Sequence, residues 1–383
     1  MADFPLLAIF LTRLLKTAFA LLVLSALLHG YSAVAEDPIG TATFTKTSCP
    51  TSGLASGTCY KVKISGCPES TTDFTAEVKV NPAPNGKKSL GADFFTTGGG
   101  GSSFYDNFAE FTTRDKRCNP SGNCGLLAVA TVNSAGFRTI QTKFSDPENA
   151  TSEPVGWLTG PAADGPRALA CRYATLVHGA WTYILGSDTS HPVCATGNSG
   201  GSAAVAYALT QYSLGSSSGP GPVLSMVEAS SGPVMAKLNR GCAKQPITAV
   251  VTCPNGTLLA DNYGPEIAAA FIDPTYDGDV DTIMDSKDIC SLQIANGGNS
   301  QLFLHDSVVS DDFPAPSYPK TFVKVVFGSK DLSSAVPQGL EWYNAITSSK
   351  AQACVSGATH EVAASFQGAT QIANDIISSC KLQ

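Results

Sequence analysis

The sequence predicts an α/β fold with a mostly parallel sheet flanked by helices, and three observations carry this prediction. Short β-branched or apolar runs bounded by turn residues indicate strands. From the fourth run onward, they alternate with segments in which apolar residues recur every three or four positions, as on one face of a helix. Charged residues make up only 14% of the 383 residues, while Gly and Pro number 36 and 23, which argues against a coiled coil or a charge-driven disordered chain.

The order of these segments predicts how the sheet is connected. The predicted strands are Tyr60–Ile64, Phe74–Val80, Ala92–Phe95, Leu126–Val132, Val193–Thr196, Val223–Val227, Phe322–Phe327 and Ala353–Val355. The predicted helices are Arg167–Ile184, Gly201–Tyr212, Gln338–Ser348 and Val362–Cys380. Alternation of strand and helix requires crossover connections, so the sheet is expected to be mainly parallel and covered on both faces. The earliest strands lack intervening helices and are expected to begin the sheet as an antiparallel pair.

Residues 234–320 interrupt this alternation before the penultimate strand. The segment holds Cys242, Cys253 and Cys290 and is too long for an ordinary loop. It predicts a cap or lid excursion that is pinned by a disulfide. An elaborated surface is the alternative.

The first 35 residues have the pattern of a signal peptide. Arg13 and Lys16 precede an apolar run from Ala18 to Leu28, and Ala33-Val34-Ala35 is a small-x-small cleavage site. Cleavage there leaves residues 36–383 as the exported domain, outside the cell or in a periplasm. An uncleaved membrane anchor is the alternative, because the apolar stretch Pro5–Leu11 lengthens the segment. No other segment is apolar enough to span a bilayer, so no stable membrane insertion is expected after cleavage.

All 12 cysteines follow residue 35, and an even number in an exported chain predicts disulfides. A zinc site would need tight pairs such as Cys-x-x-Cys, whereas the closest spacing here, Cys118 to Cys124, indicates a small closed turn. Plausible pairs are Cys118 with Cys124, Cys242 with Cys253 or Cys290, and Cys354 with Cys380.

Charge and composition exclude other classes of partner. With 24 basic and 31 acidic residues the net charge is −7, which offers no electrostatic footprint for a nucleic-acid backbone.

The run Asp277–Asp281, followed by Asp288, has the spacing of a calcium loop, but Thr282 stands where that loop needs glycine. A solvated acidic turn is the favoured interpretation. The sequence therefore predicts no metal and no cofactor, and it leaves the oligomeric state open.

The most informative motif is Gly197-Asn198-Ser199-Gly200-Gly201, between the predicted strand that ends at Thr196 and a helix-forming segment. Gly-x-Ser-x-Gly in this context predicts a nucleophile elbow, where a serine sits on a sharp strand-to-helix turn with small neighbours. The amide of Gly200 would then lie at a helix N-terminus, where backbone donors and the helix dipole stabilise an oxyanion. A tight turn without function is the alternative.

A second glycine cluster, Gly98–Gly101, follows the predicted strand Ala92–Phe95. A loop that brings its backbone to a substrate oxygen needs residues without side chains, so the amide of Gly99 or Gly100 is a candidate second oxyanion donor. A flexible surface turn is the alternative. Phosphate binding is disfavoured because neither a Lys-Ser/Thr pair nor a Gly-x-Gly-x-x-Gly spacing is present.

A nucleophilic serine needs a base, and four histidines follow the predicted cleavage site. His178 lies in a helical pattern and His191 at a strand entrance, where packing or solvation explains them. His305 falls in the excursion and is interpreted as structural. His360 comes after the last predicted strand and before the last helix, so it is the predicted base.

The acid that orients the base is predicted from chain order. Asp331 follows the strand Phe322–Phe327 and precedes His360 by 29 positions, which suits a carboxylate that fixes the imidazole tautomer. A helix-capping role is the alternative for this aspartate. Glu228 and Asp273 are the alternative acids.

These residues together resemble the α/β-hydrolases, specifically their secreted serine esterases, over nearly all of residues 58–380. The resemblance implies an eight-stranded, mostly parallel sheet and a metal-free acyl-enzyme mechanism in which Ser199 attacks, His360 moves the proton and Asp331 orients it. Two departures concern subfamily and substrate. Thr97 stands where the loop before the glycines often has histidine, and Asn198 replaces the commoner histidine or acid before the serine.

The expected function is therefore hydrolysis of a small-molecule or polymeric carboxylic ester. A serine peptidase or a polymer-ester depolymerase on the same fold is an alternative. A relative that binds ligands without turnover is a further alternative from a different class.

Overall fold

The computed structural model describes residues 37–55, 57–68, 73–113, 115–118, 121–144, 157, 165–216, 219–243, 251–253, 258–259, 271–277, 289–295, 301–311 and 315–383. The chain divides into a unit Met1–Glu36 and a unit Asp37–Gln383, and the fold below is that of the second. The predicted signal peptide lies outside the described residues, as does most of the acidic run 277–288. No helix of the described part of the chain is long and apolar enough to cross a membrane.

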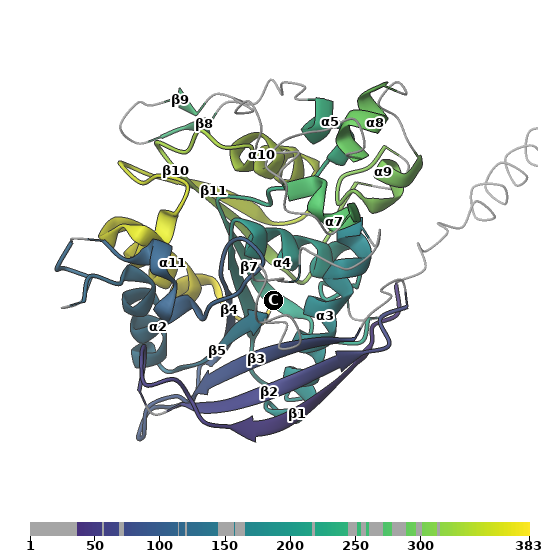
Figure 1. Cartoon of the computed structure of the whole chain (residues 1–383). Coiled ribbons are helices and arrows are strands. Elements are labelled where there is room, and N and C mark those ends of the chain that lie inside the picture. The colour runs from purple at the N-terminus through teal and green to yellow at the C-terminus, as the bar shows by residue number, and fades with distance from the viewer. Residues whose placement is uncertain are drawn as a thin grey trace, which may run out of the picture. The chain divides into compact units, whose positions relative to one another are not determined.

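A nine-stranded sheet forms the centre of this unit, in the order β1-β2-β3-β5-β4-β6-β7-β10-β11 (Figure 1). The strands are β1 (Thr41–Thr47), β2 (Thr58–Ser65), β3 (Phe74–Asn81), β4 (Gly91–Thr96), β5 (Phe137–Phe144), β6 (Val193–Asn198), β7 (Leu224–Ser230), β10 (Phe322–Gly328) and β11 (Lys350–Val355). The first three pairings, β1 with β2, β2 with β3 and β3 with β5, are antiparallel. Every pairing from β5 to β11 is parallel, which confirms a mostly parallel sheet.

Successive residues of the central strands enter two different cores, because side chains alternate across a sheet. Phe94, Ala195 and Val325 pack with α3 (Gly165–Tyr183), α4 (Gly200–Thr210) and α10 (Ala335–Ala345). Their neighbours Phe95, Cys194 and Val326 pack with α2 (Cys124–Ala135) and α11 (Phe366–Ser379). Helices thus cover both faces of the sheet, as the strand and helix alternation predicts.

The predicted strand Leu126–Val132 is wrong, because this segment is the interior of helix α2. A short apolar run does not distinguish a buried strand from a buried helix by its periodicity. The end signals decide it: the side chain of Asn123 accepts a hydrogen bond from the amide of Leu126 at 2.8 Å, and Gly136 ends the helix at a φ of 120°.

Two strands of this sheet, β1 and β5, were not predicted and one predicted strand is wrong, so the sheet has nine strands where eight were implied. Edge strand β1 has the sequence TATFTKT, which is rich in threonine and mostly exposed. Central strand β5, FRTIQTKF, has polar residues at positions that the sheet and its helices bury. Neither segment shows the apolar run by which the other strands were identified.

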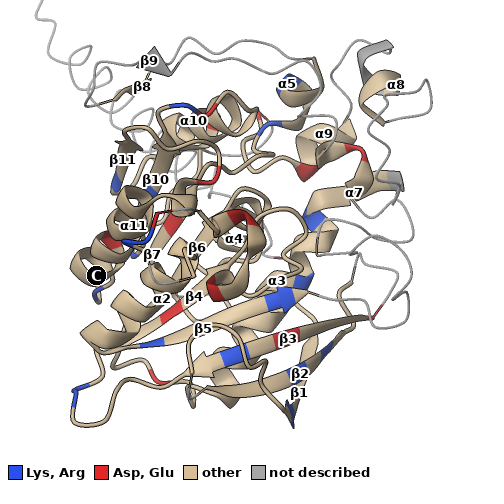
Figure 2. Cartoon of the chain, turned by 60° about the vertical axis from the view of Figure 1, so that its left-hand side comes forward, with Lys and Arg blue, Asp and Glu red and all other residues tan. Residues whose placement is uncertain are grey.

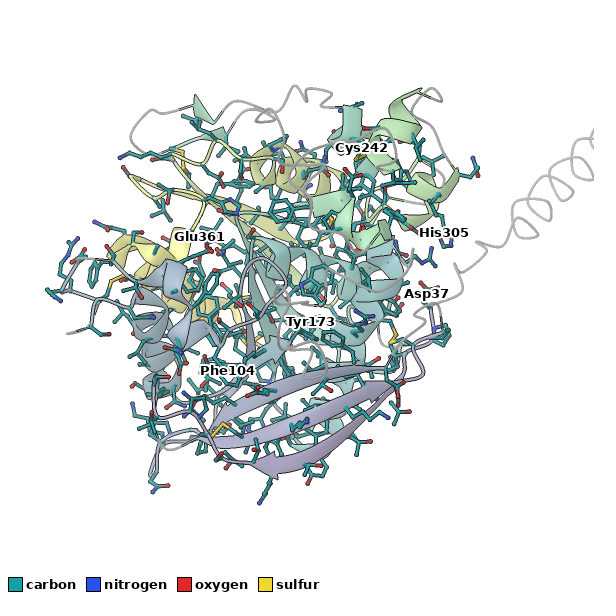
Figure 3. The ribbon with its side chains drawn as sticks, viewed as in Figure 1. Asp37, Phe104, Tyr173, Cys242, His305 and Glu361 are labelled. Carbon is teal, nitrogen blue, oxygen red and sulfur yellow. A yellow bond between two sulfur atoms is a disulfide. The ribbon has the colours of Figure 1, made fainter. Side chains whose placement is uncertain are left out.

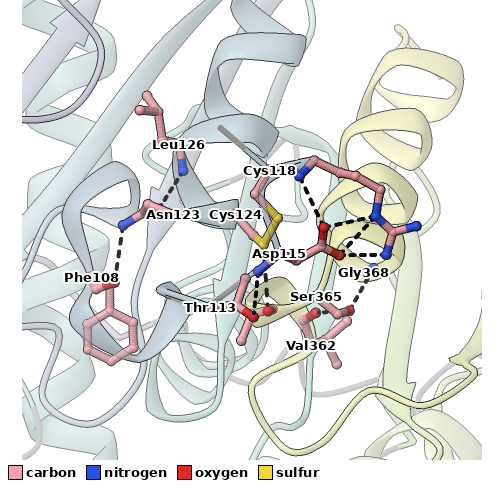
Figure 4. The surroundings of a disulfide bond; sticks show 12 residues. Phe108, Thr113, Asp115, Cys118, Asn123, Cys124, Leu126, Val362, Ser365 and Gly368 are labelled. Carbon is pink, nitrogen blue, oxygen red and sulfur yellow. Dashed lines mark hydrogen bonds and ion pairs between the residues drawn. A yellow bond between two sulfur atoms is a disulfide. The ribbon is translucent and has the colours of Figure 1, made fainter. Parts of the chain in front are cut away.

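Six disulfides join all 12 cysteines: Cys49–Cys59, Cys67–Cys171, Cys118–Cys124, Cys194–Cys380, Cys242–Cys290 and Cys253–Cys354. The prediction for Cys118 with Cys124 is confirmed (Figure 4). Cys290 is the partner of Cys242. Pairing Cys354 with Cys380 is wrong, because α11 packs back across the sheet and brings Cys380 to the start of β6. So many disulfides favour an oxidising compartment.

The described parts of the excursion 234–320 are short elements: α5 (Leu238–Ala243), β8 (Val251–Thr252), β9 (Leu258–Leu259), α7 (Pro274–Asp277), α8 (Ile289–Ala295) and α9 (Gln301–Asp306). One disulfide joins α5 to α8, and Cys253–Cys354 attaches the excursion to β11. Gln338 of α10 accepts hydrogen bonds from the amides of Ala236 and Lys237 at 2.7 and 2.8 Å. A role of the excursion as a cap remains a prediction.

Candidate active site

Ser199 stands at the turn between β6 and α4, with a φ of 51° and a ψ of −118°. A positive φ is uncommon for a residue with a side chain and marks a strained position. The turn is tight enough to require its glycines. A Cβ on Gly197 would lie 2.4 Å from the carbonyl oxygen of Gly201, and a Cβ on Gly201 would lie 2.4 Å from the carbonyl oxygen of Thr97. The glycines therefore allow the backbone to make the sharp turn on which Ser199 lies.

The structure brings Ser199, His360 and Asp331 together, although they come from distant parts of the chain. His360 Nε2 lies 2.8 Å from Ser199 Oγ, and His360 Nδ1 lies 3.2 Å from Asp331 Oδ2. The three residues follow β6, β11 and β10, so they meet where the parallel strands have their carboxyl ends. Serine and aspartate contact opposite nitrogens of one imidazole, which is the arrangement that moves a proton from the hydroxyl to the ring.

Ser333 joins this group and was missed from the sequence. Its hydroxyl donates to Asp331 Oδ1 at 2.7 Å, and its Oγ lies 2.9 Å from His360 Nδ1. The amide of Ser333 also donates to Asp331 Oδ1, at 2.9 Å. The spacing Asp331-x-Ser333 is typical of a turn in which an aspartate accepts from the residue two positions on, and this is the signal that could have identified it.

Electrostatics hold Asp331 ionised and make His360 basic. Burial raises the pKa of Asp331, but hydrogen bonds from His360 and Ser333 outweigh it and leave the pKa below the usual value. Burial lowers the pKa of His360, whereas the hydrogen bond and charge of Asp331, with smaller contributions from Glu361 and Glu110, raise it above the usual value. The pair therefore favours a carboxylate beside an imidazole that readily accepts a proton.

The glycine cluster lies directly against the serine. A Cβ on Gly98 would come within 3.1 Å of Ser199 Cβ, and Gly99, at a φ of 55°, has open space where its Cβ would be. The amide of Gly101 donates to the carbonyl of Gly98 at 3.0 Å, which closes the turn. On the other side of Ser199, Gly200 begins α4, where first-turn amides have no acceptor within the helix.

Two further polar residues complete the surroundings of the serine. Asn198 Nδ2 donates to Glu361 Oε2 at 2.5 Å, and Glu361 Oε1 lies 3.8 Å from His360 Nε2. Glu361 lies near the start of α11 (Figure 3). The sequence motifs single out neither Glu361 nor its contact with Asn198.

The alternative residues lie apart from this group. Glu228 is buried in β7, with no hydrogen-bond partner for its carboxyl oxygens among the described residues, and burial raises its pKa well above the usual value. Asp273 accepts from the amide of Cys290 at 2.8 Å. His178 Nδ1 contacts the carbonyl of Gly221 at 2.8 Å.

The other two histidines of the described residues contact carboxylates within three positions of them in the chain. His191 Nδ1 lies 2.7 Å from Asp188, and His305 Nδ1 lies 2.8 Å from Asp306. Within the described ranges, no three His, Cys, Asp or Glu side chains are grouped so that they could hold a metal ion.

Known proteins resemble this chain in fold but share little sequence identity with it. No family model and no curated protein matches the sequence. Among solved structures, acetyl xylan esterase 1 from a Thermoanaerobacterium species superposes with a TM-score of 0.51 at 14% identity, over 88% of this chain and 87% of that one. For a bacterial heroin esterase the TM-score is 0.43 at 14% identity, over 94% of this chain and 90% of that one. For an acylaminoacyl peptidase from Pyrococcus horikoshii the TM-score is 0.44 at 9% identity, over 90% of this chain and 42% of that one.

The first of these likenesses, together with the strand order and the helices on both faces, shows the fold that the motifs predicted. The chain has the α/β-hydrolase fold.

Proposed function

We propose that this α/β-hydrolase-fold protein is an exported serine hydrolase that cleaves carboxylic esters through an acyl-enzyme. The observation that carries the proposal is the placement of Ser199 Oγ at 2.8 Å from one nitrogen of His360 while Asp331 lies at the other. A base within hydrogen-bond reach of a hydroxyl, itself oriented by a third group, is the arrangement that activates a weak nucleophile. Six disulfides and the predicted signal peptide support export.

The first half of the reaction transfers the acyl group to the enzyme. Ser199 Oγ attacks the ester carbonyl carbon while His360 Nε2 takes the hydroxyl proton, and the carbonyl π electrons move to oxygen. The amide of Gly200 and that of Gly99 or Gly100 donate hydrogen bonds to this oxyanion. The tetrahedral intermediate collapses, the alcohol oxygen leaves, and it takes the proton from His360.

The second half returns the enzyme to its starting state. Water attacks the acyl carbon and gives a proton to His360, and collapse of the second intermediate expels Ser199 Oγ, which recovers that proton. The released product is the carboxylic acid. Asp331 remains ionised throughout and stabilises the imidazolium in both halves.

The direct test is labelling with a fluorophosphonate, in which an activated serine displaces fluoride from phosphorus. The mature protein is expected to carry one adduct, located by mass spectrometry at Ser199 and absent from Ser199→Ala. The matched control is Ser190→Ala, because Ser190 also contacts a histidine but lies before β6 instead of after it. A folded, disulfide-intact sample without an adduct would contradict the proposal and favour a binding relative, which stoichiometric ligand binding would then demonstrate.

Substrate class is tested by turnover of short acyl esters, peptides and an insoluble polyester under the same conditions. Ester cleavage is expected, and it is expected to disappear in Ser199→Ala. Cleavage of peptides alone would replace the ester proposal with the peptidase alternative. Release from the polymer in addition to short esters would extend the proposal to polymeric substrates.

A further inference from the structure

Resting on the proposed function, we propose that Glu361 is a positioning residue for the reaction, which ties the base loop to the nucleophile elbow and presents a carboxylate to the nitrogen that receives the proton. Glu361 follows the base His360 in the chain, and its partner Asn198 precedes the nucleophile Ser199. The two loops are thus joined twice, once through the reacting side chains and once through their neighbours.

The tie between Asn198 and Glu361 is short and shielded from water. Asn198 Nδ2 donates to Glu361 Oε2 at 2.5 Å, Asn198 is fully buried, and the side chain of Glu361 is only 18% exposed. A charge-assisted hydrogen bond in such surroundings is stronger than one between neutral groups. The backbone of Gly98 lies close to Asn198, because a Cβ added at Gly98 would come within 3.2 Å of Asn198 Nδ2. The bond therefore connects the base loop to a buried and closely packed part of the elbow.

The second oxygen of Glu361 faces the reacting nitrogen without competing for it. Glu361 Oε1 lies 3.8 Å from His360 Nε2, beyond hydrogen-bond distance, whereas Ser199 Oγ lies at 2.8 Å. When Nε2 gains the proton of Ser199, the imidazolium has Asp331 at one nitrogen and Glu361 close to the other. The carboxylate of Glu361 stabilises that charge most when it forms, which is the condition for a contribution to the rate.

The charge on Glu361 changes near neutral pH. The ionisable groups that face it are His360 on its own loop, Glu110 on η2 (Ala109–Phe111) and Tyr105 on η1 (Tyr105–Asn107), while α2 offers only the disulfide-bonded Cys124. Burial raises the pKa of Glu361 to about 7, His360 acts in the opposite direction, and the charge of Glu110 and its hydrogen bond to Glu361 add to the increase. Glu361 is therefore fully ionised, and stabilises the imidazolium fully, only above neutral pH.

Two substitutions separate the tie from the charge. Glu361→Gln keeps an oxygen that can accept from Asn198 but removes the charge, whereas Glu361→Ala removes both. For Glu361→Gln we expect kcat at pH 8 to fall about 3- to 10-fold with KM unchanged, and the acid limb of kcat to move to lower pH by roughly half a unit. Glu361→Ala is expected to lose roughly tenfold more than Glu361→Gln, because the tie to Asn198 is lost as well.

The matched control is Glu77→Gln, which removes a partly exposed carboxylate that pairs with Lys143 on the antiparallel side of the sheet. A pH profile of Glu361→Gln that superposes on those of the wild type and Glu77→Gln would overturn the role of the charge. Equal kcat values for Glu361→Gln and Glu361→Ala would contradict a role for the hydrogen bond between Glu361 and Asn198.

A measurement without turnover separates failure of this inference from failure of the proposed function. NMR titration of the imidazole nitrogens of His360 is expected to give a lower pKa in Glu361→Gln than in the wild type, since a neighbouring negative charge has been removed. An unchanged His360 pKa would overturn the inference even if the enzyme is active. A lower pKa in a protein that neither labels at Ser199 nor cleaves esters would support the contact while contradicting the proposed function.

Discussion

Two groups of serine, histidine and aspartate lie at opposite ends of β6, and they are not equivalent. Before the strand, His191 Nδ1 lies 2.7 Å from Asp188 Oδ2 and 3.1 Å from Ser190 Oγ. After the strand, Ser199 and Asp331 contact different nitrogens of His360, at 2.8 and 3.2 Å. The first group has the shorter histidine to carboxylate distance, yet its serine and its aspartate both contact Nδ1, so the aspartate does not hold the ring with the other nitrogen toward the serine.

Exposure is the second difference between the groups. The side chains of His191 and Asp188 are 40% and 42% exposed, whereas that of Asp331 is completely buried. Hydrogen bonds from Ser190 and His191 lower the pKa of Asp188 to about 2, but water screens a charge at such a position. We therefore expect the use of both ring nitrogens and the burial of the carboxylate, and not close contacts alone, to distinguish the catalytic group.

Charged positions are few over the ribbon as a whole, and basic ones lie along β2, β3 and β5 on the antiparallel side (Figure 2). The acidic residues Asp331 and Glu361 instead belong to the loops after β10 and β11. The charge that matters for the proposed reaction is thus local to the carboxyl ends of the parallel strands.

The largest difference between the two groups is expected on loss of the serine. Ser199→Ala should reduce kcat/KM for a short acyl ester by about 10⁴-fold or more, because the nucleophile is gone. Ser190→Ala should leave it within about twofold of the wild type, as an exposed substitution remote from the chemistry. Equal activity of Ser199→Ala and the wild type would remove Ser199 from the mechanism.

Next in size is the effect of the orienting acid. Asp331→Asn should lower kcat about 10³- to 10⁴-fold, because an amide no longer holds the imidazole in the tautomer that accepts the serine proton. Asp188→Asn is the matched substitution in the other group and should have no effect on turnover. Steady-state kinetics of both variants check this, and equal losses would show that the comparison is mistaken.

Activity should fall at acid pH, because His360 accepts a proton only when it is neutral. On the acid limb of the pH–rate profile, below the pKa of His360, the loss should be about tenfold for each pH unit. Its pKa is raised by Asp331, so activity is complete above that pKa and is lost as pH falls through it, at a pH higher than for an ordinary histidine. The pH dependence of kcat/KM measures the limb in the free enzyme. A limb at or below the ordinary histidine pKa would contradict this sign.

A smaller effect than for Ser199→Ala or Asp331→Asn is expected for Ser333→Ala. It removes one hydrogen bond to Asp331 and one contact with His360 Nδ1 while leaving the bond between those two residues, so kcat should fall about 5- to 20-fold. The melting temperature, followed by circular dichroism, provides the control for folding. A loss as large as that of Asp331→Asn would mean that Ser333 itself orients the imidazole.

Much of the candidate site could be predicted because its requirements are local. A serine in a sharp strand-to-helix turn needs Gly197 and Gly201 within the same few residues, so the motif is visible in the sequence. Chain order then selects His360 and Asp331, since both follow strands that precede helices. The spacing of Ser333 from Asp331 indicates their contact, but the contact of Ser333 with His360 forms only after folding. Glu361 has no such local signature, because its side chain meets Asn198 only in the folded chain.

The sequence by itself determined the α/β class, the elbow and the candidate residues, because strand periodicity, helix periodicity and turn glycines act over a few neighbouring positions. The tertiary structure alone decided that Leu126–Val132 is helical, that β5 is a central strand, and that Cys380 pairs with Cys194 instead of Cys354. These outcomes depend on burial against distant segments, and such packing overrides local preference when a short segment fits either conformation.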